Sequence, residues 1–259
     1  MIGVFDSGSG GLTVLQALRA RAPNVDLLYF GDLLNAPYGN KGAKEIETLT
    51  LQMIRFLRAQ GATHLVSACN SISATVIRPM LELCDIQVDG ITEMVGPTVD
   101  SLTHFTKKSV VFFTTHVTEQ SGMYQRACAE KNLNAQVIAI PELAGLIEAN
   151  APTETLLTEI QKGLTRAKPF HPDVIVLGCT HFPLIQALFE QATSNAAPPI
   201  FIYNPAVAVA TDALRIHGTR GTGKTTLLIS RDSKQFRRLA SDRGFRAEDI
   251  QVTKGDGLL

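Results

Sequence analysis

Two short segments far apart in the chain share one pattern: an apolar run, a cysteine and a small polar residue. Residues 63–71 read THLVSACNS and residues 173–181 read DVIVLGCTH, so Cys69 and Cys179 hold equivalent positions. Each run is short and continuous, which is typical of a parallel strand covered on both faces, and a helical pattern follows it. Because the segments lie about one domain apart, the repeat predicts two similar α/β domains with a site between them.

Short apolar runs and helical patterns alternate along the rest of the chain. In residues 45–60, for example, Ile46, Leu49, Met53 and Leu57 recur near helical spacing, with charged residues on the other face. This alternation predicts an α/β fold in which helices cover parallel sheets. We expect strands at residues 1–6, 25–30, 63–68, 109–114, 135–140, 173–178 and 200–203, and helices after the two cysteines over residues 73–83 and 183–192.

The chain is expected to cross between the two domains twice, near residues 93–97 and 203–205. The strand and helix pattern after the second crossing then rejoins the first domain. The active site is expected in the cleft between the domains, because ligands in parallel α/β sheets bind beyond the carboxyl ends of the strands. The predicted domains are residues 1–95 plus 205–259, with Asp6 and Cys69, and residues 96–204, with Cys179 and His181.

Positive and negative residues are balanced, because Lys and Arg total 24 and Asp and Glu total 24. A chain without net charge has no overall field to attract nucleic acid or an anionic membrane, so neither is expected as a partner. No apolar run approaches the roughly 18 to 20 residues that span a bilayer. The N-terminus also lacks the basic segment of a secretory signal, and we therefore expect a cytoplasmic protein.

The four cysteines include no Cys-x-x-Cys pair, which argues against a structural zinc site and a disulfide framework. No metal is expected. Cys69 and Cys179 are expected at strand ends that open helices, where the helix N-terminus can lower the thiol pKa from ~8.5 and favour the thiolate. Cys84 and Cys128 have no such position, and we interpret them as small buried hydrophobic residues.

Four segments carry a family resemblance: residues 6–13 read DSGSGGLT, 37–39 read PYG, 68–71 read ACNS and 177–184 read LGCTHFPL. Together, in this order and spacing, they resemble the signature of the glutamate racemases, within the aspartate/glutamate racemase superfamily. The resemblance implies a two-base mechanism without pyridoxal phosphate, metal or another cofactor. One thiolate removes the α-proton of an amino acid while the opposite thiol protonates the other face. The resemblance assigns the D-enantiomer to Cys69 and the L-enantiomer to Cys179.

The same resemblance implies functions for residues around the two thiols. Asp6 and His181 match groups that assist the first and the second cysteine, and Glu148 matches a catalytic glutamate of the second domain. Four other interpretations stay open: Asp6 as a turn residue, His181 as a helix cap, Glu148 as a solvated surface residue and Thr118 as a helix N-cap. The positions that match substrate contacts, with polar groups suited to carboxylates and an ammonium, are Ser7, Pro37, Tyr38, Gly39, Asn70, Ser71, Thr115, Thr118 and Thr180.

Two departures from the family pattern concern substrate specificity. Residues 33–36 read LLNA where a Thr-Ala-Arg-like run is usual, and Ser71 stands where threonine is usual. In spite of these departures, the resemblance as a whole predicts interconversion of L- and D-glutamate for peptidoglycan synthesis. It implies a small amino acid as the binding partner and a homodimer as the assembly. The alternatives are a racemase of aspartate or another amino acid, and a non-catalytic binding or regulatory protein.

One further motif points to a different class of protein. Residues 218–225 read GTRGTGKT and satisfy the Walker A pattern of a phosphate-binding loop. Such a loop follows a strand and opens a helix, whereas this segment follows the helical pattern of residues 206–216 and precedes the expected strand at residues 226–230. Because the order is reversed, we predict a surface connection and no nucleotide ligand.

Overall fold

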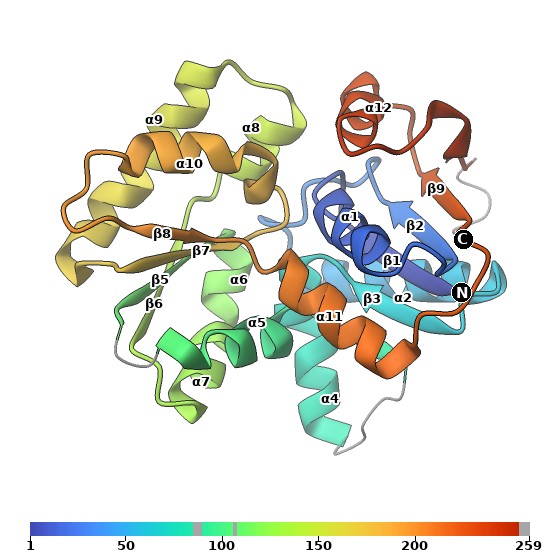
Figure 1. The fold of residues 1–259 in the computed structure, drawn as a ribbon, viewed down its shortest axis with the longest axis horizontal. Helices are drawn as coiled ribbons and strands as arrows, with labels where there is room; N and C mark the ends of the chain where they lie inside the picture. The colour runs from blue at the N-terminus through green and yellow to red at the C-terminus, as the bar shows by residue number, and fades with distance from the viewer. Residues whose placement is uncertain (85–89, 106–107, 254–259) are drawn as a thin grey trace.

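The computed structural model describes residues 1–84, 90–105 and 108–253, except the side chains of residues 82–84. Two sheets form the framework, one in each half of the molecule (Figure 1), and every strand pairing among the described residues is parallel. The predicted fold class, two parallel-sheet α/β domains, is confirmed. The strand order of the first sheet is β10-β9-β2-β1-β3-β4, and that of the second sheet is β6-β5-β7-β8. The strands of the first sheet are β1 (Ile2–Asp6), β2 (Leu27–Gly31), β3 (His64–Ser67), β4 (Ile91–Thr92), β9 (Thr225–Ile229) and β10 (Ile250–Val252). Those of the second sheet are β5 (Val110–Thr114), β6 (Ala135–Ala139), β7 (Val174–Gly178) and β8 (Phe201–Tyr203).

The first sheet combines strands from both ends of the chain, while the middle of the chain supplies the whole second sheet. The domain limits of the sequence analysis stay a prediction. No helix in the described ranges is long and apolar enough to cross a membrane. The α-helices are α1 (Leu12–Arg21), α2 (Ala43–Ala59), α3 (Asn70–Ile72), α4 (Arg78–Cys84), α5 (Val95–Ser101), α6 (His116–Ser121), α7 (Met123–Glu130), α8 (Leu143–Glu148), α9 (Thr153–Ala167), α10 (Gln186–Thr193), α11 (Ala206–His217) and α12 (Lys234–Ser241).

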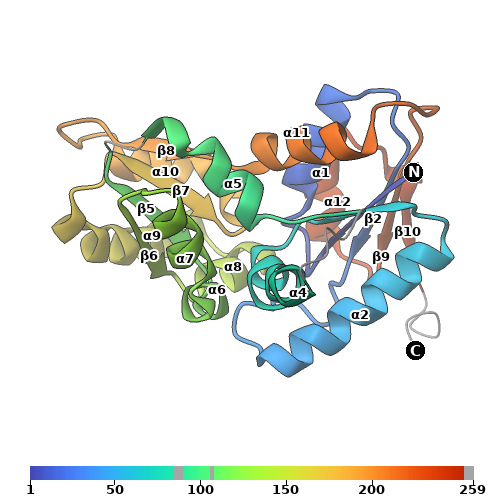
Figure 2. The same ribbon diagram turned by 90° about the horizontal axis from the view of Figure 1, so that it is seen from below.

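Helices cover both faces of each sheet because the strands alternate their apolar side chains between the two faces. In β1, Val4 packs in the core beneath α1 and α11, whereas Phe5 packs in the core beneath α2. Figure 2 shows α11 and α2 on opposite sides of the first sheet. In β5, Phe113 joins the core with α9 and α10, and Phe112 joins the core with α7. Full burial of such a side chain contributes roughly 1.5–3 kcal/mol, so both layers stabilise the strand ends that carry the site.

The helical segments after the two cysteines differ from the continuous helices that the sequence predicts. After Cys69, α3 passes into a π-helical turn, η1 (Ser73–Ile77), before α4. After Cys179, a 3₁₀ turn, η4 (Phe182–Ile185), precedes α10, and Pro183 lies at its start, where a missing N–H is tolerated. π-Helical turns are frequent at functional sites, and 3₁₀ turns are frequent at the ends of α-helices. The remaining 3₁₀ turns are η2 (Thr103–Phe105), η3 (Lys168–Phe170) and η5 (Ala247–Asp249).

Candidate active site

The carboxyl ends of four strands bring most of the predicted catalytic and binding residues to one place. Asp6 ends β1, and Cys69, Thr115 and Cys179 follow β3, β5 and β7. These strand ends and the loops that follow them surround a cavity with about 10 Å³ of free space, roughly enough for one water molecule. The cavity is lined by Ser7, Pro37, Tyr38, Gly39, Cys69, Asn70, Ser71, Thr115, Ala144, Cys179, Thr180 and His181, so both thiols face it and both sheets contribute to it.

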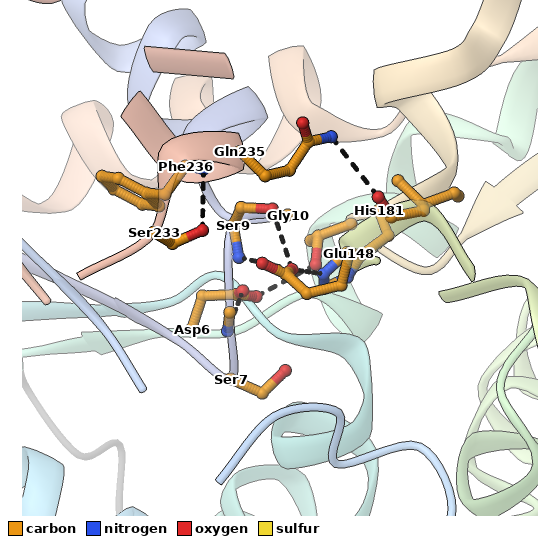
Figure 3. A network of polar contacts seen from close by, with 12 residues as sticks. Asp6, Ser7, Ser9, Gly10, Glu148, His181, Ser233, Gln235 and Phe236 are labelled. Atoms are coloured by element: carbon orange, nitrogen blue, oxygen red, sulfur yellow. Dashed lines mark hydrogen bonds and ion pairs between the residues drawn. The ribbon is translucent and has the colours of Figure 1, made fainter. Parts of the chain in front are cut away.

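The second thiol lies beside an imidazole that a carboxylate holds. Cys179 Sγ is 4.0 Å from His181 Nδ1, and His181 Nε2 is 2.6 Å from Glu148 Oε2. Figure 3 shows Glu148 and His181 pointing toward one another. The Glu148 side chain is 14% exposed, so the interpretation of Glu148 as a solvated surface residue is wrong. His181 does stand at the N-cap position of η4, but its side chain makes no capping hydrogen bond there.

The electrostatics favour an ionised Glu148–His181 pair. Burial raises the pKa of Glu148, but hydrogen bonds from His181 and Ser9 and the charge of His181 outweigh it, and the pKa lies below its usual value. Burial lowers the pKa of His181, but the hydrogen bonds and charges of Cys179 and Glu148 outweigh it and hold the pKa well above the usual value. A protonated imidazole therefore lies next to the Cys179 sulfur, where it can stabilise a negative charge.

The first thiol is held differently. Cys69 occupies the N-cap position of α3, and its Sγ donates to Ser7 Oγ at 3.5 Å. Burial raises the pKa of the Cys69 thiol to about 12, and the negative charge of Asp6 adds to this, while the hydrogen bond with Ser7 and the one from the Ile72 N–H lower it only partly. The expected lowering by the helix N-terminus is therefore outweighed by desolvation, because the residue is only 3% exposed. A pKa of about 12 favours the protonated thiol of Cys69 at neutral pH.

Asp6 links the two halves of the site. One carboxylate oxygen accepts from the Gly8 N–H at 2.8 Å, which is the contact expected of a turn residue, and the other accepts from Thr180 Oγ1 at 3.0 Å. Burial raises the pKa of Asp6, and the charge of His181 opposes this. Asp6 is therefore both a turn residue, through Gly8, and a residue of the site, through Thr180.

A chain of hydroxyls runs along one wall of the cavity. Ser71 Oγ lies 3.0 Å from Thr115 Oγ1, which in turn lies 2.9 Å from Thr118 Oγ1. Thr118 is not among the lining residues and reaches the site through Thr115. The alternative interpretation of Thr118 as an N-cap is wrong, because α6 begins at His116 and Thr115 holds its N-cap position.

Sequence reasoning missed three residues that support this site. Asp32 accepts from Tyr38 Oη at 2.6 Å and also from the Asn35 amide at 2.8 Å, so a buried carboxylate anchors the loop that carries residues 37–39. Its position directly after the apolar strand β2 was the available signal, as the position of Asp6 at the end of β1 was for that residue. The other two are Tyr124, which donates to Asn70 Oδ1, and Ser9, which donates to Glu148.

The altered segment at residues 33–36 does not line the cavity. Leu33 is buried in the core, Leu34 is exposed, and Asn35 holds Asp32. The departure from the family pattern is therefore connected to the cavity through Asp32, which also holds Tyr38. Of the two cysteines expected to be structural, Cys128 is buried as predicted, and the side chain of Cys84 lies outside the described residues.

The Walker-like segment has the predicted position, between α11 and β9. Two backbone N–H groups and one hydroxyl of the loop donate to a carboxylate of the chain itself: Asp26 Oδ1 accepts from Thr222 N at 2.9 Å, from Thr222 Oγ1 at 2.7 Å and from Lys224 N at 3.0 Å. A loop of this composition does bind an anion, but here the anion is the carboxylate of Asp26, which directly precedes β2.

Comparison with known proteins agrees with this geometry. The family model of Asp/Glu/Hydantoin racemase matches residues 11–213. The chain belongs to this family, and it is an enzyme of the racemase class. Among its relatives are the glutamate racemases of Paracoccus denitrificans, 34% identical over 225 residues that cover 81% of this chain and 82% of the relative, and of Thermus thermophilus, 30% identical over 256 residues that cover 96% and 95%.

Solved structures show the same fold. The glutamate racemase of Thermus thermophilus in complex with beta-chloro-D-alanine superimposes with a TM-score of 0.79 at 30% identity and covers 99% of this chain and 97% of its own. A glutamate racemase isoform from Bacillus anthracis superimposes with a TM-score of 0.85 at 24% identity and covers 98% and 97%. The resemblance to glutamate racemases that the sequence predicts is confirmed.

Proposed function

We propose that the protein interconverts L- and D-glutamate by proton transfer at the α-carbon, with Cys69 and Cys179 as the two acid–base groups. The observation that carries the proposal is that both thiols, from equivalent strand ends of different sheets, line one small cavity. Inversion of a stereocentre by proton transfer needs a base on one face and an acid on the other. The site supplies one thiol for each.

In the direction from L- to D-glutamate, the Cys179 thiolate removes the α-proton and Cys69 donates its thiol proton to the opposite face. The Cys69 pKa of about 12 keeps that thiol protonated and ready to donate. The positive charge of His181 beside Cys179 stabilises the thiolate that must exist before the proton is taken. In the reverse direction the two thiols exchange their protonation states, so the proton count is conserved over each turnover.

The α-proton of an amino acid is a weak acid, and its removal requires donors around the carboxylate where charge develops. Among the described lining residues the one cationic side chain is His181, which lies between Cys179 and Glu148, so neutral donors must bind the carboxylate. Asn70 is suited to it, because the residue lines the cavity and its amide Nδ2 is buried without a hydrogen-bond partner. The hydroxyls of Ser71, Thr115 and Thr180 are further candidates.

Glutamate is the proposed substrate because the curated relatives at 30–34% identity are glutamate racemases. An aspartate racemase from Picrophilus torridus shares the fold with a lower TM-score of 0.60. In a cytoplasm that builds peptidoglycan, such an enzyme would supply D-glutamate to that synthesis. A homodimer is a further prediction, which sedimentation analysis of the purified protein would check.

The direct test incubates the purified protein with single L-amino acids in deuterated water. We expect L-glutamate to lose optical activity while deuterium appears at Cα, with aspartate and other amino acids much slower. Faster exchange on aspartate than on glutamate would support the alternative that the protein is an aspartate racemase. No exchange on any amino acid would overturn the racemase proposal.

Cys69→Ala and Cys179→Ala should each lower racemisation by about 10²- to 10⁴-fold or more, since each removes one of two proton-transfer groups. Cys128→Ala is the matched control, because Cys128 is also a buried thiol but belongs to α7 and packs in the core of the second half, outside the cavity lining. The two-thiol mechanism fails if either active-site variant keeps full turnover.

A further inference from the structure

Ser9 places two donors on the carboxylate that holds His181. Its backbone N–H donates to Glu148 Oε2 at 3.0 Å and its Oγ donates to the same oxygen at 2.8 Å. His181 Nε2 lies 2.6 Å from that oxygen too, so three donors converge on one atom (Figure 3). Ser9 stands at the unspecified position of the Asp-Ser-Gly-x-Gly-Gly segment, which is why the motif alone did not identify it.

The loop is shaped for this contact. A Cβ atom at Gly8 would lie 2.8 Å from Glu148 Oε2 and 3.2 Å from His181 Nε2. A Cβ atom at Gly10 would lie 2.7 Å from His181 Nδ1. Glycine on both sides of Ser9 therefore allows the backbone to lie directly against the Glu148–His181 pair, and Ser9 itself is fully buried.

The contact joins the two halves of the molecule. Glu148 ends α8 and His181 follows β7, so both belong to the half built around the second sheet. Ser9 belongs to the loop between β1 and α1 of the first sheet. The carboxylate–imidazole pair can form within its own half, whereas the two donors of Ser9 reach it only when the halves are together.

The charges explain what those donors do. Burial alone raises the pKa of Glu148, and both hydrogen bonds from Ser9 are among the contacts that lower it. An ionised Glu148 in turn helps to keep the proton on His181. A hydroxyl that donates to a carboxylate is a charge-assisted hydrogen bond, which is stronger than one between neutral groups.

We propose that Ser9 is a positioning residue that locks Glu148 onto His181 when the two halves meet, and so supports proton transfer at Cys179 but not at Cys69. This inference rests on the proposed two-thiol racemase function. The contact between the two halves is thereby coupled to Cys179, the thiol that acts on L-glutamate.

The test begins with Ser9→Ala, which removes the hydroxyl without adding bulk. We expect kcat/KM to fall about tenfold, as for loss of one hydrogen bond to a charged group. Enantiomers have equal free energies in water, so kcat/KM must fall equally in both directions whichever thiol is affected. A separate measurement must therefore tell the two faces apart.

Deuterium isotope effects on kcat/KM make that distinction, with L- and D-glutamate deuterated at Cα. If transfer at Cys179 becomes slower, the isotope effect rises for L-glutamate, whose α-deuteron Cys179 removes, and falls for D-glutamate. Ser7→Ala is the matched comparison, because Ser7 contacts Cys69 Sγ, and it should show the opposite change. A merely structural weakening of the loop would move both isotope effects in the same direction, and that result would overturn the proposal, as would no change in either.

A second readout does not depend on activity. In ¹⁵N-histidine NMR spectra, with His181→Gln used for assignment, the His181 ring should be an imidazolium at neutral pH and should titrate at lower pH in Ser9→Ala. An unchanged titration would overturn the inference, while absence of racemisation by the wild type with the expected shift in His181 would overturn only the proposed function. Circular dichroism checks folding, and Ser9→Gly removes the same hydroxyl if Ser9→Ala does not fold.

Discussion

At the scale of single residues, the orientation of one amide decides what the cavity offers a substrate. Asn70 lines the cavity and is 2% exposed, and Tyr124 Oη donates to its Oδ1, while its Nδ2 group has no hydrogen-bond partner. Burial raises the pKa of Tyr124 well above its usual value, so the phenol remains a donor at any working pH. Tyr124 thus fixes which end of the Asn70 amide is available to a carboxylate.

We expect Tyr124→Phe to raise KM for glutamate by about five- to tenfold, because the amide loses the donor that fixes it, with a loss of stability of about 1 kcal/mol. The ring still packs against Phe112, so the fold is kept. Steady-state kinetics and thermal unfolding measure the two effects. Tyr203→Phe is the control: its hydroxyl donates to Ser101 Oγ at 2.6 Å away from the cavity, and an equal rise in KM there would contradict the explanation.

At the scale of elements, the Walker-like loop explains how α11 returns the chain to the first sheet. Three donors of the loop converge on Asp26 Oδ1, and Gly223 N donates to Asn24 O at 2.9 Å. Gly223 has φ +79°, a conformation that favours glycine. The hydrogen bonds also lower the pKa of Asp26, with the contact from the Thr222 hydroxyl as the largest cause. The glycines and threonines of the motif therefore serve a structural turn beside β2.

This assignment predicts that Asp26→Ala lowers Tm by several degrees, because three donors lose their acceptor. Lys224→Ala keeps its backbone N–H and should change Tm little. A Walker site would show the reverse dependence, with Lys224 essential for binding ATP and magnesium. Thermal unfolding with and without the nucleotide distinguishes them, and stabilisation of the wild type by ATP that Lys224→Ala abolishes would contradict the structural assignment.

At the scale of the whole molecule, the sequence predicted what depends on local pattern and failed where distant segments meet. Apolar runs that end in Asp6, Cys69 and Cys179 reveal strand ends, because burial on both faces of a parallel sheet demands such runs. The contact of Ser9 with Glu148 joins two halves whose relative placement no periodicity encodes. The depth of burial that raises the Cys69 pKa to about 12 is likewise a property of the assembled fold, and the helix position alone predicted the opposite direction.

The stability of the assembled fold should depend on a histidine pair outside the active site. His217 at the end of α11 stacks on His64 of β3, with ring centroids 4.2 Å apart and planes 18° apart. Burial is the largest cause that lowers the pKa of His217, to about 4, and the charge of His64 is the second. The charge of Arg58 lowers this pKa further, whereas the charge of Asp212 raises it. Burial also lowers the pKa of His64, and the N-terminal amine and Arg58 add to this.

Between pH 6.5 and 4 these two rings therefore bind more protons in the unfolded chain than in the folded chain. The pair contributes stability that is fully present above pH 6.5 and is lost as pH falls toward 4. The free energy of unfolding lost between pH 7 and 5 should be smaller in His217→Gln than in the wild type, because one titrating ring is gone, whereas the opposite contribution of His181, whose pKa is raised, is present in both proteins. His116→Gln replaces an exposed histidine and should keep the wild-type slope. Equal slopes in all three proteins, from denaturant unfolding at each pH, would show that the stacked pair does not couple protonation to folding.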